Sequence, residues 1–305
     1  MTAHKTAVIG LGAMGMGMAT SAHAGGLDVT GVDVNANAVA ALAAAGARTA
    51  ATPAQAADGA DSLAVVVVNK EQTEAVLFGP DGAAAALPKG AVVMDCATVP
   101  AGYARDLGAR IEDLGLLYLD APISGGAAKA AAGELTVMAS GSAAAFARAK
   151  PFLDAIAERV FELGAEPGQG STMKMVNQLL AGVHIATAME AVALGLKAGL
   201  DAQTMYDVIT NAAGNSWMFG NRVPRVISGD YAPKSAVGIF TKDLGIVLGE
   251  GERLGIDLPL AKTALSRYDA AAEMGLKGQD DSAVIKVYAR DAGIDLPGGD
   301  EKPDT

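Results

Sequence analysis

Short apolar runs alternate with alanine-rich amphipathic stretches over the first 165 residues of the chain. The amphipathic stretches at 35–46, 71–78 and 100–114 have the apolar spacing of helices. The runs between them have the length of buried strands: TAVIG (6–10), VTGVDV (29–34), LAVVVVN (63–69), AVVMDCAT (91–98) and LLYLDAP (116–122). Strands that alternate with helices indicate a parallel sheet covered on both faces. We therefore expect a doubly wound α/β domain over residues 1–166.

Beyond residue 170 the strand pattern fades and the apolar spacing becomes helical. Apolar residues recur at positions i, i+3 and i+4 in three segments: DAQTMYDVITNAAG, IFTKDLGIVLGEGERLG and KTALSRYDAAAEMG. We expect a long interdomain helix over 167–198 and an all-α domain over 199–295. The tail at 296–305 has the proline, glycine and acidic content of a disordered segment.

The long helix contains the most apolar segment of the chain, LLAGVHIATAMEAVALGLKAGL. Its length fits a membrane span, but it carries His184, Glu190 and Lys197 and is rich in alanine and glycine. We favour a helix buried between the two domains. The N-terminus runs within five residues into a predicted strand without an apolar leader, which favours the cytoplasm.

Composition excludes several classes of partner and chemistry. A net charge of −11 with a pI near 4.7 argues against a nucleic-acid partner, and an anionic substrate would need a local lysine or arginine. Cys96 is the one cysteine, so no disulfide forms within the chain. His4, His23 and His184 are scattered, so we expect no metal site.

A glycine-rich turn, GLGAMGMGMA, follows the first predicted strand. Gly10 permits the tight turn, Gly12 permits close approach of a pyrophosphate, and Gly15 permits close packing of the next helix. The free N–H groups of that helix would face the phosphates. Such a motif arises by chance in a chain with 38 glycines, and a turn without a ligand is the alternative. Its position between strand and helix favours a dinucleotide, held by Gly10, Leu11, Gly12, Ala13, Met14 and Gly15.

The second strand supports the same interpretation, because it ends at Asp33, 23 residues after Gly10. A carboxylate at this place can accept from the ribose hydroxyls and would repel a 2′-phosphate. Val34 follows it, so no cation is placed to receive that phosphate. We therefore predict NAD rather than NADP, and the fold is predicted to be of the Rossmann type.

Two later stretches offer groups that could use a dinucleotide. In DAPISGGAAKAAAGELTVM, Ser124 offers a hydroxyl and Gly125 and Gly126 offer open backbone N–H groups, which together can bind a carboxylate. An ordinary turn is the alternative. A glycine and alanine loop here is expected to lead into another strand.

In GQGSTMKMVNQLL, Lys174, Asn177 and Gln178 share one helix face. Partial desolvation would favour the neutral form of the lysine, which could then take a proton from a substrate hydroxyl. A lone helix lysine is more often a solvated surface residue, but the surrounding apolar sequence favours burial. Further on, Lys242 and Asp243 adjoin in an apolar helix start, where a surface ion pair is the alternative to a functional role.

Taken together, these motifs resemble those of the β-hydroxyacid dehydrogenases, a family that includes 3-hydroxyisobutyrate dehydrogenase and tartronate semialdehyde reductase. The matching segments are VIGLGAMGMGMA, DAPISGG with GELTVM, GQGSTMKMVNQ and KDLGIVL. The resemblance implies that Lys174 is the catalytic residue and that Ser124, Gly125 and Gly126 hold the substrate carboxylate. It also implies a substrate contact from Asn177 or Gln178, and cofactor contacts from Thr98 and Lys242.

Two positions depart from the family pattern. Ala97 stands where the family has a serine, so only Thr98 can supply a hydroxyl there. Gln178 stands where many members have a second asparagine, and its longer amide could reshape the pocket.

Residues 211–248 most resemble the branch of the family that oxidises the C2 hydroxyl of a four-carbon sugar acid, L-threonate, to a 2-oxo acid. Polar side chains in this stretch could bind further hydroxyls (Asn211, Asn215, Ser216 and Asn221), while Trp217, Met218 and Phe219 could equally be packing residues. Oxidation of L-threonate with NAD in a cleft between the domains is the predicted activity. Alternatives are 3-hydroxyisobutyrate oxidation, tartronate or succinic semialdehyde reduction, and non-catalytic dinucleotide binding. The apolar content of the helical domain predicts a homodimer or homotetramer.

Overall fold

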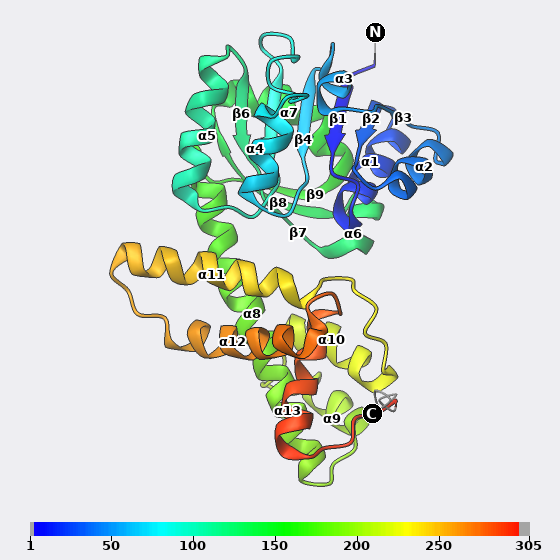
Figure 1. Ribbon diagram of the computed structural model, residues 1–305, viewed down its shortest axis with the longest axis vertical. Coiled ribbons are helices and arrows are strands. Elements are labelled where there is room, and N and C mark those ends of the chain that lie inside the picture. The colour runs from blue at the N-terminus through cyan, green and yellow to red at the C-terminus, as the bar shows by residue number, and fades with distance from the viewer. Residues whose placement is uncertain (1–2, 299–305) are drawn as a thin grey trace. The chain divides into compact units, whose positions relative to one another are not determined.

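The computed structural model describes residues 3–298, which form two compact units with a boundary between Lys174 and Met175 (Figure 1). Each unit has its own hydrophobic core. The long helix α8 (Gln169–Lys197) begins in the first unit and ends in the second. Most of the predicted disordered tail, residues 299–305, lies outside the described residues.

The first unit is built on one sheet with the strand order β3-β2-β1-β4-β5-β6-β8-β7, and β9 pairs with β8. The strands are β1 (Lys5–Ile9), β2 (Asp28–Val32), β3 (Arg48–Thr49), β4 (Ser62–Val65), β5 (Val92–Asp95), β6 (Leu117–Asp120), β7 (Ile123–Ser124), β8 (Leu135–Gly141) and β9 (Ala157–Glu162). The six strands from β3 to β6 are parallel and follow the order 3-2-1-4-5-6 of a Rossmann fold, as predicted.

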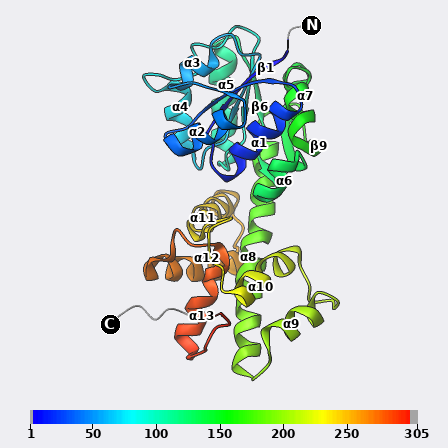
Figure 2. The ribbon, with the colours of Figure 1, turned by 90° about the vertical axis from the view of Figure 1, so that its right-hand side faces the viewer.

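Helices connect these strands and cover the sheet (Figure 2). They are α1 (Ala13–Ala24), α2 (Ala36–Ala44), α3 (Pro53–Ala57), α4 (Lys70–Phe78), α5 (Ala101–Asp113), α6 (Gly126–Ala132) and α7 (Ala143–Ile156). The pleat of the strands divides their side chains between two cores. Val8 packs with α1 and α7, whereas its neighbours Ala7 and Ile9 pack with α3, α4 and α5. Burial on both faces explains why these strands are continuous apolar runs.

Register places the carboxyl ends of the parallel strands in one row. Ile9 lies opposite Val32 and Val65, and Val65 lies opposite Asp95, which in turn lies opposite Asp120. The segments that follow these residues therefore emerge along the same edge of the sheet. The order of the strands reverses at β1, which makes the turn after Ile9 the switch point where such sheets bind ligands.

The structure corrects the prediction at the far edge of the sheet. Strand β8 runs antiparallel to both β6 and β7, so the sheet is mixed there and not wholly parallel. The expected glycine and alanine loop after Ser124 contains the short helix α6, because the alanines of GAAKAAA have high helix propensity. Strand β9 is absent from the sequence prediction, since its side chains are exposed or half-buried and lack an apolar run.

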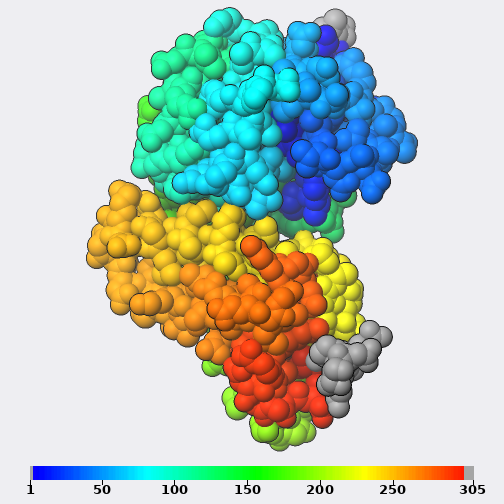
Figure 3. Space-filling view, viewed as in Figure 1, coloured from blue at the N-terminus to red at the C-terminus, as the bar shows by residue number. Residues whose placement is uncertain are grey.

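In the second unit, the elements after α8 are helical. They are α9 (Ala202–Ile209), α10 (Trp217–Ser228), α11 (Val237–Leu254), α12 (Pro259–Ala271), the π-helical segment η1 (Ala272–Leu276), the 3₁₀ segment η2 (Asp281–Val284) and α13 (Ile285–Ala292). The core forms where α8, α10, α11 and α12 meet, and Phe240 stacks on Tyr268 with ring centroids 5.2 Å apart. Figure 3 shows the yellow-to-orange surface of α11 and α12 covering one side of this unit.

Among the described residues, one helix, α8, is long and apolar enough to cross a membrane by length and composition. Half of its most apolar window is buried inside the protein. Ile185, Met189 and Val192 are buried in the core of the second unit, so α8 is the core helix of that unit.

Candidate active site

The three glycines after β1 have separate structural roles. Gly10 has φ +95°, and a side chain there would place its Cβ 2.3 Å from the carbonyl oxygen of Val66. A Cβ on Gly15 would lie 1.8 Å from the carbonyl oxygen of Gly10, so α1 can begin this close to the turn only because residue 15 lacks a side chain. A Cβ on Gly12 would meet nothing within 4 Å. Packing thus explains Gly10 and Gly15, whereas Gly12 faces open space that a ligand can use.

Helix α1 begins directly after this open space. Its N-cap is Gly12, and no side chain caps the helix. The N–H groups of the first turn of a helix lack partners within it and carry a partial positive charge, which attracts an anion. Residues 10–15 therefore present an uncapped helix start beside open space, which is the arrangement that a phosphate group requires.

Asp33 follows β2 and is tied to this turn. One carboxylate oxygen accepts from the backbone N–H of Leu11 at 2.5 Å, and the other accepts from the backbone N–H of Asn35 at 2.7 Å. These bonds fix the carboxylate beside the glycine turn. The next residue in the sequence, Val34, is fully exposed and carries no positive charge. Thr98 follows β5 at the same edge of the sheet and is half-buried, while Ala97 is buried.

The loop after β7 presents Ser124, Gly125 and Gly126. Ser124 is half-buried at the end of the strand, and Gly125 and Gly126 have φ of +139° and +79°, which side-chain-bearing residues rarely adopt. A Cβ on Gly126 would meet nothing within 4 Å. The hydroxyl and the open backbone of this segment are suited to a small anion.

Lys174 is brought to this same segment by α8. Its side chain is 8% exposed, and its Nζ donates to the carbonyl oxygen of Ile123 at 2.8 Å. Ile123 directly precedes Ser124, so the lysine and the predicted carboxylate loop are neighbours in the first unit. The sequence alternative of a solvated surface lysine is wrong, because the side chain is buried.

The anchor of this arrangement is Asp120, which the sequence analysis missed. Its carboxylate accepts from the backbone N–H groups of Gly168 and Ser171 at 2.9 and 2.8 Å, and from the Ser171 hydroxyl at 2.7 Å. Burial raises the pKa of Asp120, and these hydrogen bonds oppose that rise. An acid directly after a buried strand and inside a motif was the available signal. The carboxylate fixes the start of α8 and thereby the position of Lys174.

A chain of polar contacts joins α8 to α11 in the second unit. Lys242 Nζ lies 2.7 Å from one carboxylate oxygen of Asp243, and Gln178 Nε2 donates to the other at 2.5 Å. Asn177 Nδ2 in turn donates to Gln178 Oε1 at 2.9 Å. Asp243 is 2% exposed, so the surface ion pair considered from sequence is wrong for its carboxylate. The structure brings Asn177, Gln178 and Lys242 together through Asp243.

The polar residues of 211–221 are engaged in local structure. Asn211 and Asn215 donate to backbone carbonyls, Ser216 caps α10, and Asn221 accepts from Arg222 and Arg225. Phe219 is buried, whereas Trp217 is 61% exposed. These contacts account for the four polar side chains without a ligand. Within residues 3–298, no group of three or more metal-ligating side chains is placed to hold a metal ion.

The Rossmann sheet, the glycine turn with its uncapped helix at the switch point and the buried lysine are the features of a dinucleotide-dependent oxidoreductase. Comparison with known proteins makes this specific. Residues 5–164 match the model of the NAD-binding domain of 6-phosphogluconate dehydrogenase, and residues 168–288 match that of the NAD-binding domain of NADP-dependent 3-hydroxyisobutyrate dehydrogenase. The chain belongs to the 3-hydroxyisobutyrate dehydrogenase family of NAD-dependent hydroxyacid dehydrogenases, which confirms the resemblance and the enzyme class.

Relatives match the chain over nearly its whole length. It is 52% identical to L-threonate dehydrogenase of Cupriavidus necator over 95% of the chain and 97% of that protein. It is 35% identical to NAD-dependent L-serine dehydrogenase of Pseudomonas aeruginosa over 93% of the chain and 97% of that protein. A solved structure of 3-hydroxyisobutyrate dehydrogenase from Salmonella typhimurium, 50% identical, superposes with a TM-score of 0.90 and covers 94% of this chain and 100% of that one.

Proposed function

We propose that this protein oxidises the C2 hydroxyl of L-threonate to the 2-oxo acid with NAD. The observation that carries the mechanism is the buried Lys174, whose Nζ lies 2.8 Å from the carbonyl oxygen of Ile123, the residue before Ser124. The observation that carries the substrate is the 52% identity to an L-threonate dehydrogenase over nearly the full length of both chains.

The cofactor fits the groups that the structure presents. Residues 10–15 would hold the pyrophosphate, since the space beside Gly12 is open and α1 has no side-chain cap. Asp33 would accept from the ribose hydroxyls with its remaining lone pairs, and Thr98 and Lys242 would contact the nicotinamide half. When bound, NAD supplies the hydride acceptor. One matching family model is described as NADP-dependent, but Asp33 favours NAD because its charge would repel a 2′-phosphate.

The residues of the chain would handle the substrate and its proton. The Ser124 hydroxyl and the backbone N–H groups of Gly125 and Gly126 would donate to the substrate carboxylate. Lys174, in its neutral form, would accept the proton of the C2 hydroxyl, and the Ile123 carbonyl would hold its Nζ in place. Either Asn177 or Gln178 would contact the substrate from the next turn of α8.

The second candidate substrate is 3-hydroxyisobutyrate, because a solved structure with 50% identity is described as a 3-hydroxyisobutyrate dehydrogenase. That acid carries its reacting hydroxyl on C3, one carbon further from the carboxylate. It also lacks the additional hydroxyls of threonate. The same lysine and carboxylate loop would serve both acids, so the two activities differ in the distance from the carboxylate to the reacting hydroxyl and in what surrounds the distal end of the substrate.

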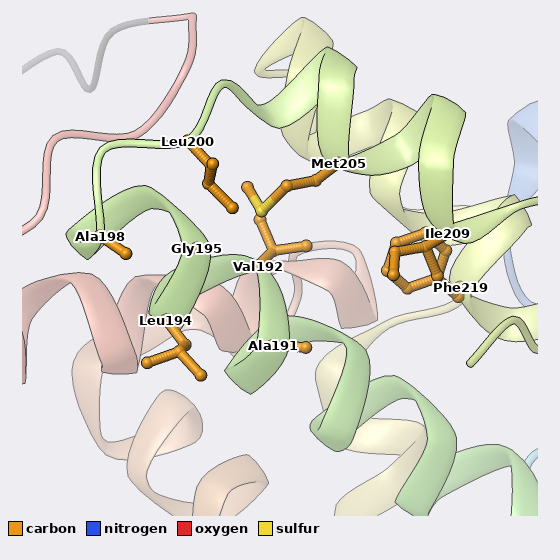
Figure 4. Close-up of a pocket in the computed structure, with 9 residues that line it drawn as sticks. All are labelled: Ala191, Val192, Leu194, Gly195, Ala198, Leu200, Met205, Ile209 and Phe219. Carbon is orange, nitrogen blue, oxygen red and sulfur yellow. The ribbon is translucent and has the colours of Figure 1, made fainter. Parts of the chain in front are cut away.

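A homodimer or homotetramer in the cytoplasm is the proposed state. The support is an apolar surface near the end of α8, where Leu194 and Leu200 are 72% and 55% exposed. These two leucines line a pocket of about 510 Å³, whose other lining residues are also apolar and belong to the second unit (Figure 4). Exposed apolar surface of this kind marks interfaces between chains. Sedimentation equilibrium checks the proposal, and a monomer at micromolar concentration would contradict it.

The test of activity is NADH formation at 340 nm. L-Threonate, D-threonate, D-erythronate, 3-hydroxyisobutyrate, D-glycerate and L-serine are each supplied with NAD and with NADP. We expect the highest kcat/KM with L-threonate and NAD. Preference for 3-hydroxyisobutyrate would replace the substrate but keep the lysine mechanism. Absence of turnover with every acid and both cofactors would reject the proposed function.

A further inference from the structure

The contacts between α8 and α11 decide which amide meets the substrate. We propose that Asp243 is a positioning residue that, through Gln178, turns the carbonyl oxygen of Asn177 toward the substrate as a hydrogen-bond acceptor. Asn177 is then the substrate contact and Gln178 is its support. The inference rests on the proposed function in one respect, namely that a hydroxy acid is bound beside Lys174.

Asp243 sets the direction of the hydrogen bonds, because a carboxylate paired with a lysine can only accept them. Gln178 must therefore turn its Nε2 toward Asp243, at 2.5 Å. The oxygen and the nitrogen of a side-chain amide point in different directions from the carbon they share. Gln178 Oε1 therefore faces away from Asp243 and needs a separate hydrogen-bond donor. Asn177 supplies that donor through Nδ2, at 2.9 Å. One fixed acceptor thus determines the orientation of two amides in succession.

Packing leaves Gln178 little freedom to rearrange. Its side chain is 7% exposed, and Asp243 is 2% exposed. One turn further along α8, a Cβ on Gly182 would come within 3.0 Å of Phe240 and of Leu244, the residue that follows Asp243. The two helices approach closely because residue 182 lacks a side chain. A buried amide flipped against a carboxylate would lose its hydrogen bond and face a like partial charge, which is costly at this burial.

Asn177 is left with its Oδ1 and one N–H. Within residues 3–298, the hydrogen bonds of Asn177 include a partner for Nδ2 and none for Oδ1. Asn177 lies three residues after Lys174 in α8, on the face that bears the lysine. An acceptor beside the general base is suited to a hydroxyl donor on the carbon next to the reacting one. The site therefore favours a substrate with vicinal hydroxyls, such as a sugar acid.

The experiment is a double-variant cycle that exchanges donor and acceptor without changing side-chain size. Asp243→Asn and Gln178→Glu are made singly and together. The ratio of kcat/KM for L-threonate to that for 2,4-dihydroxybutyrate of the same C2 configuration, which lacks the C3 hydroxyl, is measured for each. We expect the ratio to fall about tenfold in each single variant, the effect of losing one hydrogen bond of about 1.4 kcal/mol.

The double variant should restore the relay with donor and acceptor exchanged. The new amide at position 243 can donate to the new carboxylate at position 178, and that carboxylate can again accept from Asn177 Nδ2. The ratio should therefore recover to within about threefold of the parent value, because only one hydrogen bond of ordinary strength has changed its direction.

A matched control pair exists on α9, where Gln203 Nε2 donates to Asp207 at 2.9 Å on the exposed surface. Asp207→Asn should leave the ratio unchanged. An unchanged ratio in Asp243→Asn, or a double variant no better than the worse single one, would overturn the proposal.

A second readout does not depend on turnover. The side-chain amide protons of Gln178 and Asn177 are followed by ¹H–¹⁵N NMR and assigned from their loss in Gln178→Ala and Asn177→Ala. Asp243→Asn should move both pairs of signals, and the double variant should return the Asn177 pair toward its original position. Unmoved amide signals in Asp243→Asn would overturn the relay. If no hydroxy acid is turned over while the signals move as expected, the proposed function fails and the relay stands.

Discussion

The carboxylate of Asp120 and the first turn of α8 at Ser171 are joined by two hydrogen bonds, from the backbone N–H at 2.8 Å and from the hydroxyl at 2.7 Å. These residues are 51 positions apart in the sequence. The carboxylate lies at the positive end of α8, where the neighbouring N–H group of Gly170 donates to the Ser140 hydroxyl at 3.0 Å. Because Lys174 follows Ser171 by three residues in α8 and bonds to Ile123, this contact places the proposed general base beside the loop proposed to hold the substrate carboxylate.

Removing that carboxylate should therefore lower stability. Asp120→Ala leaves the buried donors of Gly168 and Ser171 without an acceptor, and we expect the free energy of unfolding to fall by about 3 kcal/mol. Urea denaturation measures the change. Asp154→Ala, which breaks an exposed ion pair with Lys150, is the control and should cost less than about 1 kcal/mol. Equal effects of the two variants would show that Asp120 is not an anchor.

The role of Lys174 as general base predicts a specific kinetic loss. Lys174→Ala should reduce kcat by about a thousandfold, since a positioned acid–base group contributes about 10²–10⁴ to the rate. NADH binding, followed by fluorescence, should change less than about threefold. Lys150→Ala, at an exposed helix position, should retain full activity. Persistence of turnover in Lys174→Ala would favour a different base or a dinucleotide-binding role without catalysis by this lysine.

Asp33 should set the choice of cofactor. Asp33→Ala removes a charged acceptor from the ribose hydroxyls, so the KM for NAD should rise about tenfold or more, while activity with NADP should improve. Initial rates with both cofactors at saturating acid give the comparison. Asp28→Asn, which affects the ion pair of Asp28 at the start of β2 with the exposed Arg48 on β3, should leave both KM values unchanged. A higher KM for NADP in Asp33→Ala would contradict the assignment.

The pH dependence of stability should report the contact between Asp280 and Arg225. Burial acts to raise the pKa of Asp280, but hydrogen bonds from Arg225 and Ser282 outweigh it and hold the pKa below the ordinary value of 3.8. A carboxyl with a lowered pKa in the folded state stabilises the fold above pH 3.8, and this contribution is lost as pH falls through the folded-state pKa. Arg225→Gln should cost about 3 kcal/mol near pH 7, and the difference from the parent should shrink below about pH 4.

Urea denaturation at four pH values from neutral down to about pH 3 measures that difference. Arg290→Gln, in an exposed pair with Asp291, serves as the control and should show a small effect at every pH. A difference between Arg225→Gln and the parent that stays constant over this range would mean that the charge of Asp280 is not what the arginine stabilises.

Cys96 should be inert in the folded protein. Burial, with the nearby charges of Asp95 and Asp120, raises the pKa of the Cys96 thiol well above its ordinary value. Since the thiolate is the reactive form, we expect reaction with a thiol-specific disulfide reagent at about pH 8 to be roughly 100-fold slower in the native protein than in concentrated urea. A surface thiol introduced by Ser266→Cys provides the reactive control. Rapid modification of native Cys96 would show that this segment opens readily.

Elements that are fully buried can be predicted from the sequence, because burial requires apolar residues. Strands buried on both faces must be apolar throughout, so the apolar runs locate β1, β4, β5 and β6 within a few residues of their observed bounds. The strand β9 could not be predicted in this way, because its residues are half-buried or exposed and form no apolar run. The helix α6 resembles a loop in the sequence because Gly125, Gly126 and Gly133 flank its six residues of good helix propensity, AAKAAA.

The sequence by itself determined the alternation of strands and helices that indicates a Rossmann-type domain, the glycine turn with its acid at Asp33, and the presence of a lysine on an apolar helix, because each depends on residues that are near one another in the chain. Only the tertiary structure decided which buried polar groups become partners. Asp120 meets Ser171 across 51 residues, and Gln178 meets Asp243 across 65. A buried hydrogen-bonding group needs a partner, and the fold determines which group lies close enough to be that partner. The local sequence pattern does not contain this information.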